Sequence, residues 1–77
     1  MLYLSELTID DKAELITIMG PSHAKKRLSD LGLTPGTKIQ IRRKAAHRGP
    51  IVIQFRGGTL VIGYKLASKI QIKKYHD

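Results

Sequence analysis

The sequence predicts a mostly β fold: a small barrel of about five strands with one short inserted α-helix, formed by a single domain over residues 1–77. Two patterns support this prediction. Short apolar segments separated by turn residues indicate strands, and one apolar stripe at helical spacing indicates the helix. About five short strands in so small a chain can bury a core only if the sheet curls on itself.

The first strand is predicted over residues 15–18, after a turn-forming pair of aspartates. Its phase stays open. Ile16 and Ile18 alternate along the strand, whereas Leu15 and Ile18 would share a face only across a β-bulge.

A short helix is predicted over residues 23–31, with Ser22 as its N-cap. Gly32 stands where a C′ glycine ends a helix, and a proline follows shortly after it. The apolar stripe that faces the core consists of Ala24, Leu28 and Leu31.

A type II turn is predicted at residues 34–37, because proline presets φ at its first central position and Gly36 accepts positive φ at the second. A strand follows with Ile39 and Ile41 pointing inward. The polar segment over residues 43–50 is predicted to be a basic loop.

A β-hairpin is predicted where two apolar strands flank Gly57-Gly58. A two-residue loop at these glycines would place Phe55 opposite Leu60 in the core, with Ile53 opposite Ile62. The two strands cover residues 51–56 and 59–62, and a helical turn over 64–68 leads to a closing strand over 70–72.

Charge is distributed unevenly along the chain, whose formal net charge is +8. Residues 1–24 hold four acidic residues and one lysine, whereas residues 25–77 hold thirteen basic and two acidic residues. This asymmetry favours an anionic partner, such as nucleic acid, an acidic protein face or an anionic membrane surface. A basic face that serves only solubility remains an alternative.

Several features predict a cytoplasmic protein that does not span a membrane. The chain has no cysteine, which fits a reducing compartment. Its first residues lack the basic and apolar regions of a signal peptide. No apolar segment approaches the roughly 20 residues needed to cross a bilayer.

Motifs for catalysis or cofactor binding are missing from the sequence, so neither an enzyme nor a bound cofactor is predicted. No glycine-rich loop is placed to hold phosphate, and no serine adjoins a histidine at a useful spacing. The three histidines fall in separate segments and are expected to be exposed rather than to bind metal: His23, His47 and His76. Nonspecific nucleic-acid binding stays open, although aromatic side chains for base stacking are few.

The segment over residues 27–39 resembles the signature of the FeoA family, ferrous iron transport protein A. It reads Arg-Leu-Ser-Asp-Leu-Gly-Leu-Thr-Pro-Gly-Thr-Lys-Ile. That signature has Arg-Leu, then Leu/Met-Gly-Leu, then a Pro-Gly turn and a strand. The opening segment 4–7 and the closing segment 66–72 also resemble the family. The chain departs from it at residues 46–48, where the family often has Pro-x-Gly, and this departure concerns the conformation of the loop.

The resemblance implies an SH3-like, cytoplasmic accessory protein that acts on FeoB, the membrane permease for ferrous iron with a cytoplasmic GTP-binding domain. The same type of domain forms the C-terminal regulatory region of iron-dependent repressors. Because the chain starts at its own methionine and lacks a winged-helix segment, a free-standing protein is expected. A basic nucleic-acid-binding barrel and a detached repressor domain remain as alternatives, and self-association stays open.

A partner-binding surface is predicted on the outward face of the hairpin, where two valines lie among basic residues. An apolar centre bordered by arginines is common in protein interfaces. The alternative patch is on the helix, at Lys26 and Arg27, although Arg27 could equally pair with Glu6 or Asp30. The residues of the first surface are Arg42, Arg43, Val52, Gln54, Arg56 and Val61.

Overall fold

The computed structural model of the chain describes residues 1–76, which form one antiparallel sheet and three short helices. The strands are β1 (Leu2–Tyr3), β2 (Lys12–Ile18), β3 (Lys38–Lys44), β4 (Ile51–Phe55), β5 (Gly58–Ile62) and β6 (Ile70–Lys74). The helices are the 3-10 helix η1 (Leu4–Glu6) and the α-helices α1 (Ser22–Asp30) and α2 (Tyr64–Ala67).

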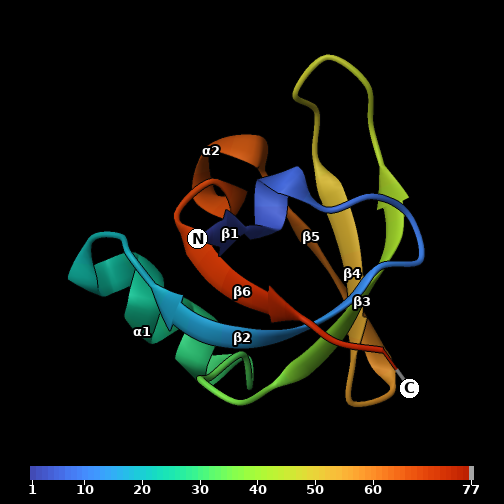
Figure 1. Cartoon of the computed structure of the whole chain (residues 1–77). Helices are drawn as coiled ribbons and strands as arrows, with labels where there is room; N and C mark the ends of the chain where they lie inside the picture. The colour runs from blue at the N-terminus through green and yellow to red at the C-terminus, as the bar shows by residue number, and fades with distance from the viewer. Residues whose placement is uncertain (77) are drawn as a thin grey trace.

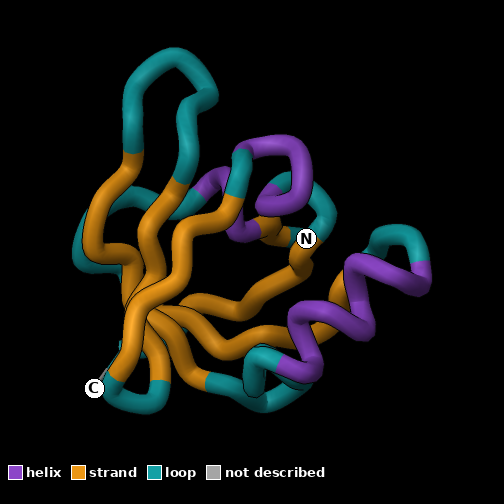
Figure 2. The backbone as a smooth tube through the Cα atoms, turned by 180° about the vertical axis from the view of Figure 1, so that it is seen from behind, coloured by secondary structure: helices purple, strands orange, loops and turns teal. Residues whose placement is uncertain are grey.

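The strands follow one another in the order β1-β6-β2-β3-β4-β5, so that β1 and β5 are the two edges of the sheet. The sheet curls around the core, and α1 lies beside the end of β2 (Figure 1). Seen from behind, the strands lie close together at one end and fan out towards the two α-helices (Figure 2). This arrangement confirms the predicted mostly β barrel with an inserted helix.

The sheet has six strands rather than the predicted five, because the N-terminal segment adds β1. Leu2 pairs with Ile72 and Tyr3 pairs with Gln71 of β6. Two residues are too short to show an alternating pattern, so sequence periodicity could not reveal this strand.

The phase of β2 is set by a β-bulge between Leu15 and Thr17. As a result, Leu15 and Ile18 both face the core, with exposed fractions of 0% and 6%. Ile16 is exposed instead. The bulge is therefore the correct choice between the two phases that the sequence left open.

Helix α1 begins one residue earlier than predicted, with Pro21 rather than Ser22 at its N-cap position. Its C-terminus has the expected glycine: Gly32 has φ +94°. The Leu33 N–H donates to the Leu28 oxygen at 2.9 Å, which is the pattern of a Schellman motif. Leu31 is exposed, contrary to the predicted stripe, because the chain reverses at Gly32 and places Leu33 in the core.

Strand β3 extends to Lys44, so Arg43 and Lys44 belong to a strand and not to the predicted loop. A second bulge lies between Ile41 and Arg43. The preceding turn forms as predicted: the Thr37 N–H donates to the Thr34 oxygen at 3.0 Å, and the following strand begins at Lys38.

The hairpin between β4 and β5 forms, but its predicted register is wrong. Phe55 pairs with Gly58, so the two loop residues are Arg56 and Gly57 rather than two glycines. Both have positive φ, 51° and 79°, as a type I′ turn requires. Each partner moves by two residues, which leaves the side chains that remain in β4 and β5 on their predicted faces, whereas Arg56 moves from the strand into the turn. Phe55 is only half-buried, because it lies next to the turn.

The core lies between the two halves of the curled sheet and is closed by the N-terminal segment and α2. Its largest fully buried side chains are Leu4, Leu7, Leu15, Leu33, Ile41, Ile51, Ile53 and Ile70. Across residues 1–76, none of the helices is long and apolar enough to span a bilayer.

Candidate functional site

The outward face of β3, β4 and β5 brings together four of the six residues predicted to bind a partner. Arg43 pairs with Val52, and Val52 pairs with Val61, so the three side chains form one row across the strands. Gln54 lies two residues from Val52 on the same face. We call these four residues the strand face: Arg43, Val52, Gln54 and Val61.

The strand face is open to solvent mainly at its outer end. Val61 is 62% exposed, which is high for an apolar residue inside a strand. Arg43 is exposed, whereas Val52 and Gln54 are half-buried. The row therefore places a cationic side chain at one end and an uncovered apolar side chain at the other.

Two of the predicted arginines occupy special backbone positions. Arg42 is exposed and stands at the bulge of β3, beside the strand face. Arg56 is not part of that face, contrary to the prediction. It belongs to the hairpin turn and lines a hollow with Asp30 and Gly32 at the C-terminal end of α1.

The helix patch consists of Lys26 and Arg27, which are both exposed on α1. Arg27 lines a groove between α1 and β5. The carboxylate of Glu6, which the sequence offered as a partner for Arg27, accepts a hydrogen bond from the Tyr3 N–H at 3.0 Å.

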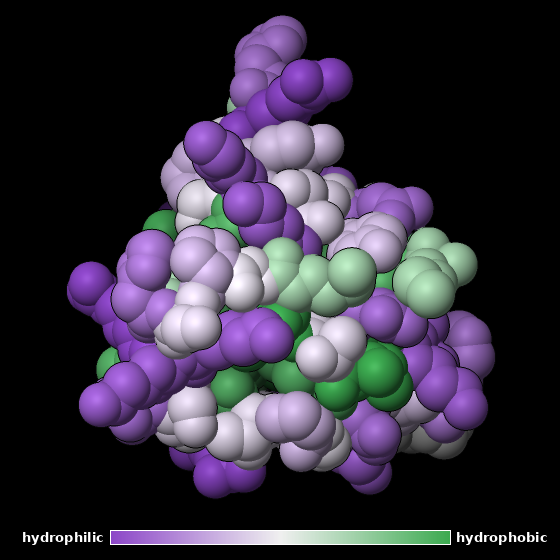
Figure 3. Space-filling model, turned by 90° about the vertical axis from the view of Figure 1, so that its left-hand side faces the viewer, coloured by the Kyte–Doolittle hydropathy of each residue, from purple (hydrophilic) through white to green (hydrophobic). Residues whose placement is uncertain are grey.

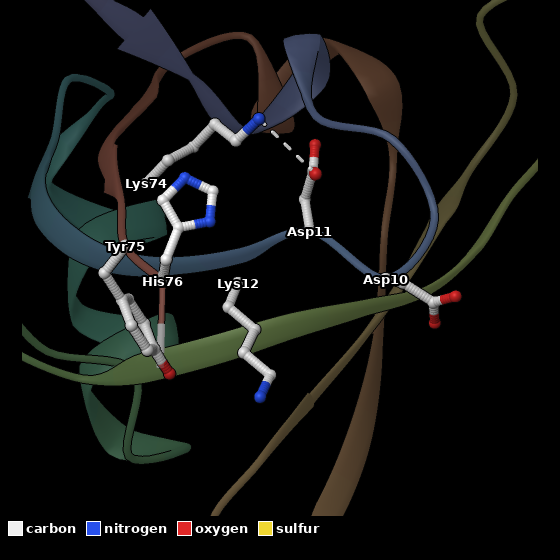
Figure 4. A pocket seen from close by; sticks show the side chains of 6 residues that line it. All are labelled: Asp10, Asp11, Lys12, Lys74, Tyr75 and His76. Carbon is white, nitrogen blue, oxygen red and sulfur yellow. Dashed lines mark ion pairs between the residues drawn. The ribbon is translucent and has the colours of Figure 1, made fainter.

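A charged pocket lies where the turn before β2 meets the end of β6 (Figure 4). The Lys74 ammonium lies 3.4 Å from an Asp11 carboxylate oxygen, while Asp10 points away from Lys74. The Thr8 N–H donates to the other Asp11 oxygen at 2.8 Å. Hydrogen bonds from Thr8, together with the charge of Lys74, lower the pKa of Asp11 against the opposing effect of burial. Asp11 therefore stabilises the turn before β2 by accepting a hydrogen bond from Thr8 and pairing with Lys74.

The three histidines are exposed, and they lie in α1, in the loop after β3 and after β6. In the part of the chain that the structure describes, histidine and carboxylate side chains form no group of three that could hold a metal ion.

The loop after β3 has an unusual backbone. His47 and Arg48 both have left-handed conformations, with φ of 57° and 61°. The Gly49 N–H donates to the Ala46 oxygen at 3.1 Å and closes the turn. The Arg48 guanidinium lies 5.7 Å from the centre of the Tyr64 ring. The residues that depart from the family pattern thus form a tight turn without a glycine at its two central positions.

One residue with a clear structural role was not identified from the sequence. Lys44 pairs with Ile51 on the inner face of β3, and its ammonium donates to the Leu7 oxygen at 2.6 Å. Alternation along the sequence could not reveal that Lys44 points inward, because the bulge before Arg43 changes which residues of β3 face the core.

The curled six-stranded sheet, with α1 inserted between β2 and β3, defines the chain as a small SH3-like domain. The model of the FeoA domain matches residues 2–74. A crystal structure of an iron uptake regulatory protein (FeoA) is 35% identical and has a TM-score of 0.87, over 96% of this chain and 97% of that chain. The FeoA protein from Chlorobium tepidum is 31% identical with a TM-score of 0.90, over 97% of this chain and 71% of that chain. The chain therefore belongs to the FeoA family, which is associated with ferrous iron transport.

More distant structures share the fold. FeoA from Stenotrophomonas maltophilia, a prokaryotic SH3 domain protein solved with zinc, is 18% identical with a TM-score of 0.79, over 95% of this chain and 91% of that chain. A manganese-dependent transcriptional repressor is 14% identical with a TM-score of 0.88, over 96% of this chain but only 36% of the repressor. A search of curated protein sequences finds no match.

Proposed function

We propose that this protein is a cytoplasmic accessory protein of ferrous iron uptake, which acts by binding the cytoplasmic domain of a FeoB-type permease and not by catalysis. Membership of the FeoA family supports the link to iron transport. The observation that carries the proposal is the row from Arg43 through Val52 to Val61, an exposed apolar end beside a cationic one.

The strand face has the properties of a small interaction surface. Apolar side chains such as Val61 lose contact with water when a partner covers them, which stabilises the complex. Arginines at the border add charge that speeds encounter with an acidic partner. Because the chain carries a net charge of +8, an acidic surface on the permease is the complementary choice.

A pull-down with the permease's cytoplasmic domain tests the proposal, using Val61→Glu and Arg43→Glu variants. Lys73→Glu is the matched control, because Lys73 is exposed on β6, away from the strand face. We expect Val61→Glu to weaken binding by about tenfold, or about 1.4 kcal/mol, because it places a charge in an apolar contact. Arg43→Glu is expected to weaken binding mainly by slowing association. Circular dichroism checks that the variants are folded.

The outcomes separate the surface from the function. If both strand-face variants bind like the wild type while Lys26→Glu and Arg27→Glu do not, the helix patch is the binding surface. If the wild-type protein does not bind the permease domain at all, the proposed function is wrong.

Nonspecific nucleic-acid binding is the second candidate function, and the charge of +8 favours it. Single-strand binding usually also uses open aromatic faces. In this protein Lys38 lies over the Tyr75 ring and Arg48 lies over the Tyr64 ring, so one face of each ring already contacts a cationic side chain. Steep loss of binding to random DNA as salt rises would support this function, because it reports the release of counterions.

The third candidate function is that of a free-standing relative of a repressor's regulatory domain. The only support for it is the fold that the chain shares with the manganese-dependent repressor.

A further inference from the structure

A groove of about 340 Å³ lies between α1 and the edge strand β5. On the side that carries α1, apolar side chains are visible among hydrophilic ones (Figure 3). Leu31, at the helix side of the groove, is 51% exposed, and Leu60 on β5 is half-buried. The apolar lining includes Ala24, Leu28, Leu31, Leu60, Ile62 and Leu66.

Strand β5 forms one side of the groove and is an edge of the sheet. Edge strands normally carry charges or proline that discourage pairing with another chain. The sequence of β5, Gly-Thr-Leu-Val-Ile, contains neither. An uncharged edge next to an apolar groove is therefore available to a further strand.

The hairpin register determines which main-chain groups point to this edge. The pair that closes a two-residue hairpin, Phe55 and Gly58, exchanges hydrogen bonds, and such pairs alternate along the ladder. Leu60 therefore bonds back to β4. Thr59 and Val61 direct their N–H and C=O groups outward, where a strand added to the sheet would pair with them.

The charges around the groove indicate what kind of strand fits. Arg27 and His23 line the groove on the α1 side, and Arg56 lines the adjoining hollow at the hairpin end. Asp30 is the acidic side chain that faces the same hollow. With a net charge of +8, a second copy of the chain would be repelled, whereas an acidic segment would be attracted.

We propose that this groove binds an extended acidic segment of a partner protein, which adds to β5 as a further strand. Main-chain hydrogen bonds to Thr59 and Val61 would supply affinity, and alternate apolar side chains of the segment would enter the groove. Because successive side chains of a strand point to opposite faces, the acidic side chains that reach Arg27 and Arg56 would be those at the two ends of the segment. The site shares Val61 with the strand face but otherwise uses the edge of β5 and the groove beside α1 rather than the outward surface of the strands.

The test uses a synthetic peptide, acetyl-Glu-Val-Glu-Val-Glu-Val-Glu-amide, titrated into the full chain and followed by amide NMR. We expect the largest shift changes along β5 and α1, and amide exchange at Thr59 and Val61 slowed by about tenfold at saturation. The same peptide N-methylated at every residue lacks main-chain donors and is expected not to bind. The Lys-Val counterpart tests the charge and is also expected not to bind.

Two variants with matched controls test the side-chain contacts. Arg27→Gln and Leu31→Gln are each expected to weaken peptide binding several-fold. Lys73→Gln and Ile9→Gln change an exposed lysine and an exposed isoleucine outside the groove and are expected to bind normally. Arg43→Glu alters the strand face and is expected to leave peptide binding unchanged, so this test stands apart from the permease pull-down.

Four outcomes would overturn the proposal. In the first, the peptide leaves the amides of Thr59 and Val61 unchanged. In the second, the Lys-Val or the N-methylated peptide binds as well as the acidic one. In the third, the β5 amides shift with protein concentration alone, which would assign the edge to a second copy. Displacement of the peptide by a short single-stranded oligonucleotide would assign the groove to phosphate.

Discussion

The ammonium group of Lys44 lies 2.6 Å from the main-chain oxygen of Leu7. It also donates to the Ser5 oxygen at 2.8 Å. Lys44 comes from β3, whereas Ser5 and Leu7 belong to the N-terminal segment and are buried. One lysine therefore fixes the segment after β1 to the middle of the sheet, by supplying donors to two carbonyl groups.

Replacing Lys44 by methionine is expected to lower the free energy of unfolding by about 1.5–3 kcal/mol, because hydrogen bonds from a charged donor are lost at half-buried oxygens. Methionine keeps most of the length of the side chain, which limits the loss of packing. Urea denaturation followed by circular dichroism measures the change. Lys73→Met is the control on an exposed strand position, and an equal loss in both variants would contradict this role for Lys44.

The hairpin register leads to a comparison between Ile53 and Phe55. Ile53 is completely buried, while Phe55 lies beside the turn and is half-buried. Ile53→Ala is therefore expected to cost about 2–5 kcal/mol, the usual range for a buried aliphatic side chain. Phe55→Ala is expected to cost less than Ile53→Ala in the same urea experiment. The reverse order would support the register that places Phe55 opposite Leu60.

The sequence predicted the fold because each prediction rested on a local signal. The Pro-Gly turn and the glycine after α1 both require positive φ, and both have it. The hairpin register failed because Gly57-Gly58 suggested a loop of two glycines, while Arg56 proved able to take the first left-handed position. Nothing in the sequence distinguishes a loop at Gly57-Gly58 from one at Arg56-Gly57, because both loops place the same strand residues inward.

The candidate surfaces were less predictable, because they depend on tertiary position. Alternation along β4 and β5 was enough to place Val52 and Val61 on one outward face. Arg56 was misplaced because the direction of a turn residue follows from the turn type and not from alternation. The groove beside β5 was missed entirely, since it exists only where α1 packs near an edge that is distant in sequence.

The left-handed conformation of Gly32 predicts a cost for any side chain there. Gly32→Ala is expected to destabilise the fold by about 1 kcal/mol or more, because φ is +94°. An added Cβ would meet Phe55 at 3.8 Å, an ordinary contact, so the cost comes from the backbone. Gly63→Ala is the matched control, since Gly63 has φ −63° and open space around it. Similar thermal unfolding temperatures for the two variants would contradict this explanation.

The turn before β2 predicts a pH dependence of stability that depends on Asp11. Hydrogen bonds from Thr8 and the charge of Lys74 lower the pKa of Asp11 below its ordinary value of 3.8. A carboxyl group with a lower pKa in the folded state stabilises the fold above its unfolded pKa. That stability is lost as the pH falls through the folded pKa, so the loss from Asp11 occurs below about pH 4.

Asp11→Asn is expected to flatten this acid dependence, because asparagine keeps an oxygen for Thr8 but carries no charge. Urea denaturation at a series of pH values between about 5 and 2 measures the free energy of unfolding of both proteins across this range. The wild-type protein should lose more stability than Asp11→Asn as the pH falls. Lys74→Gln should change the slope less than Asp11→Asn, since the hydrogen bond from Thr8 is the largest cause of the lowered pKa. Parallel curves for the wild type and Asp11→Asn would show that the Asp11 carboxylate does not stabilise this turn.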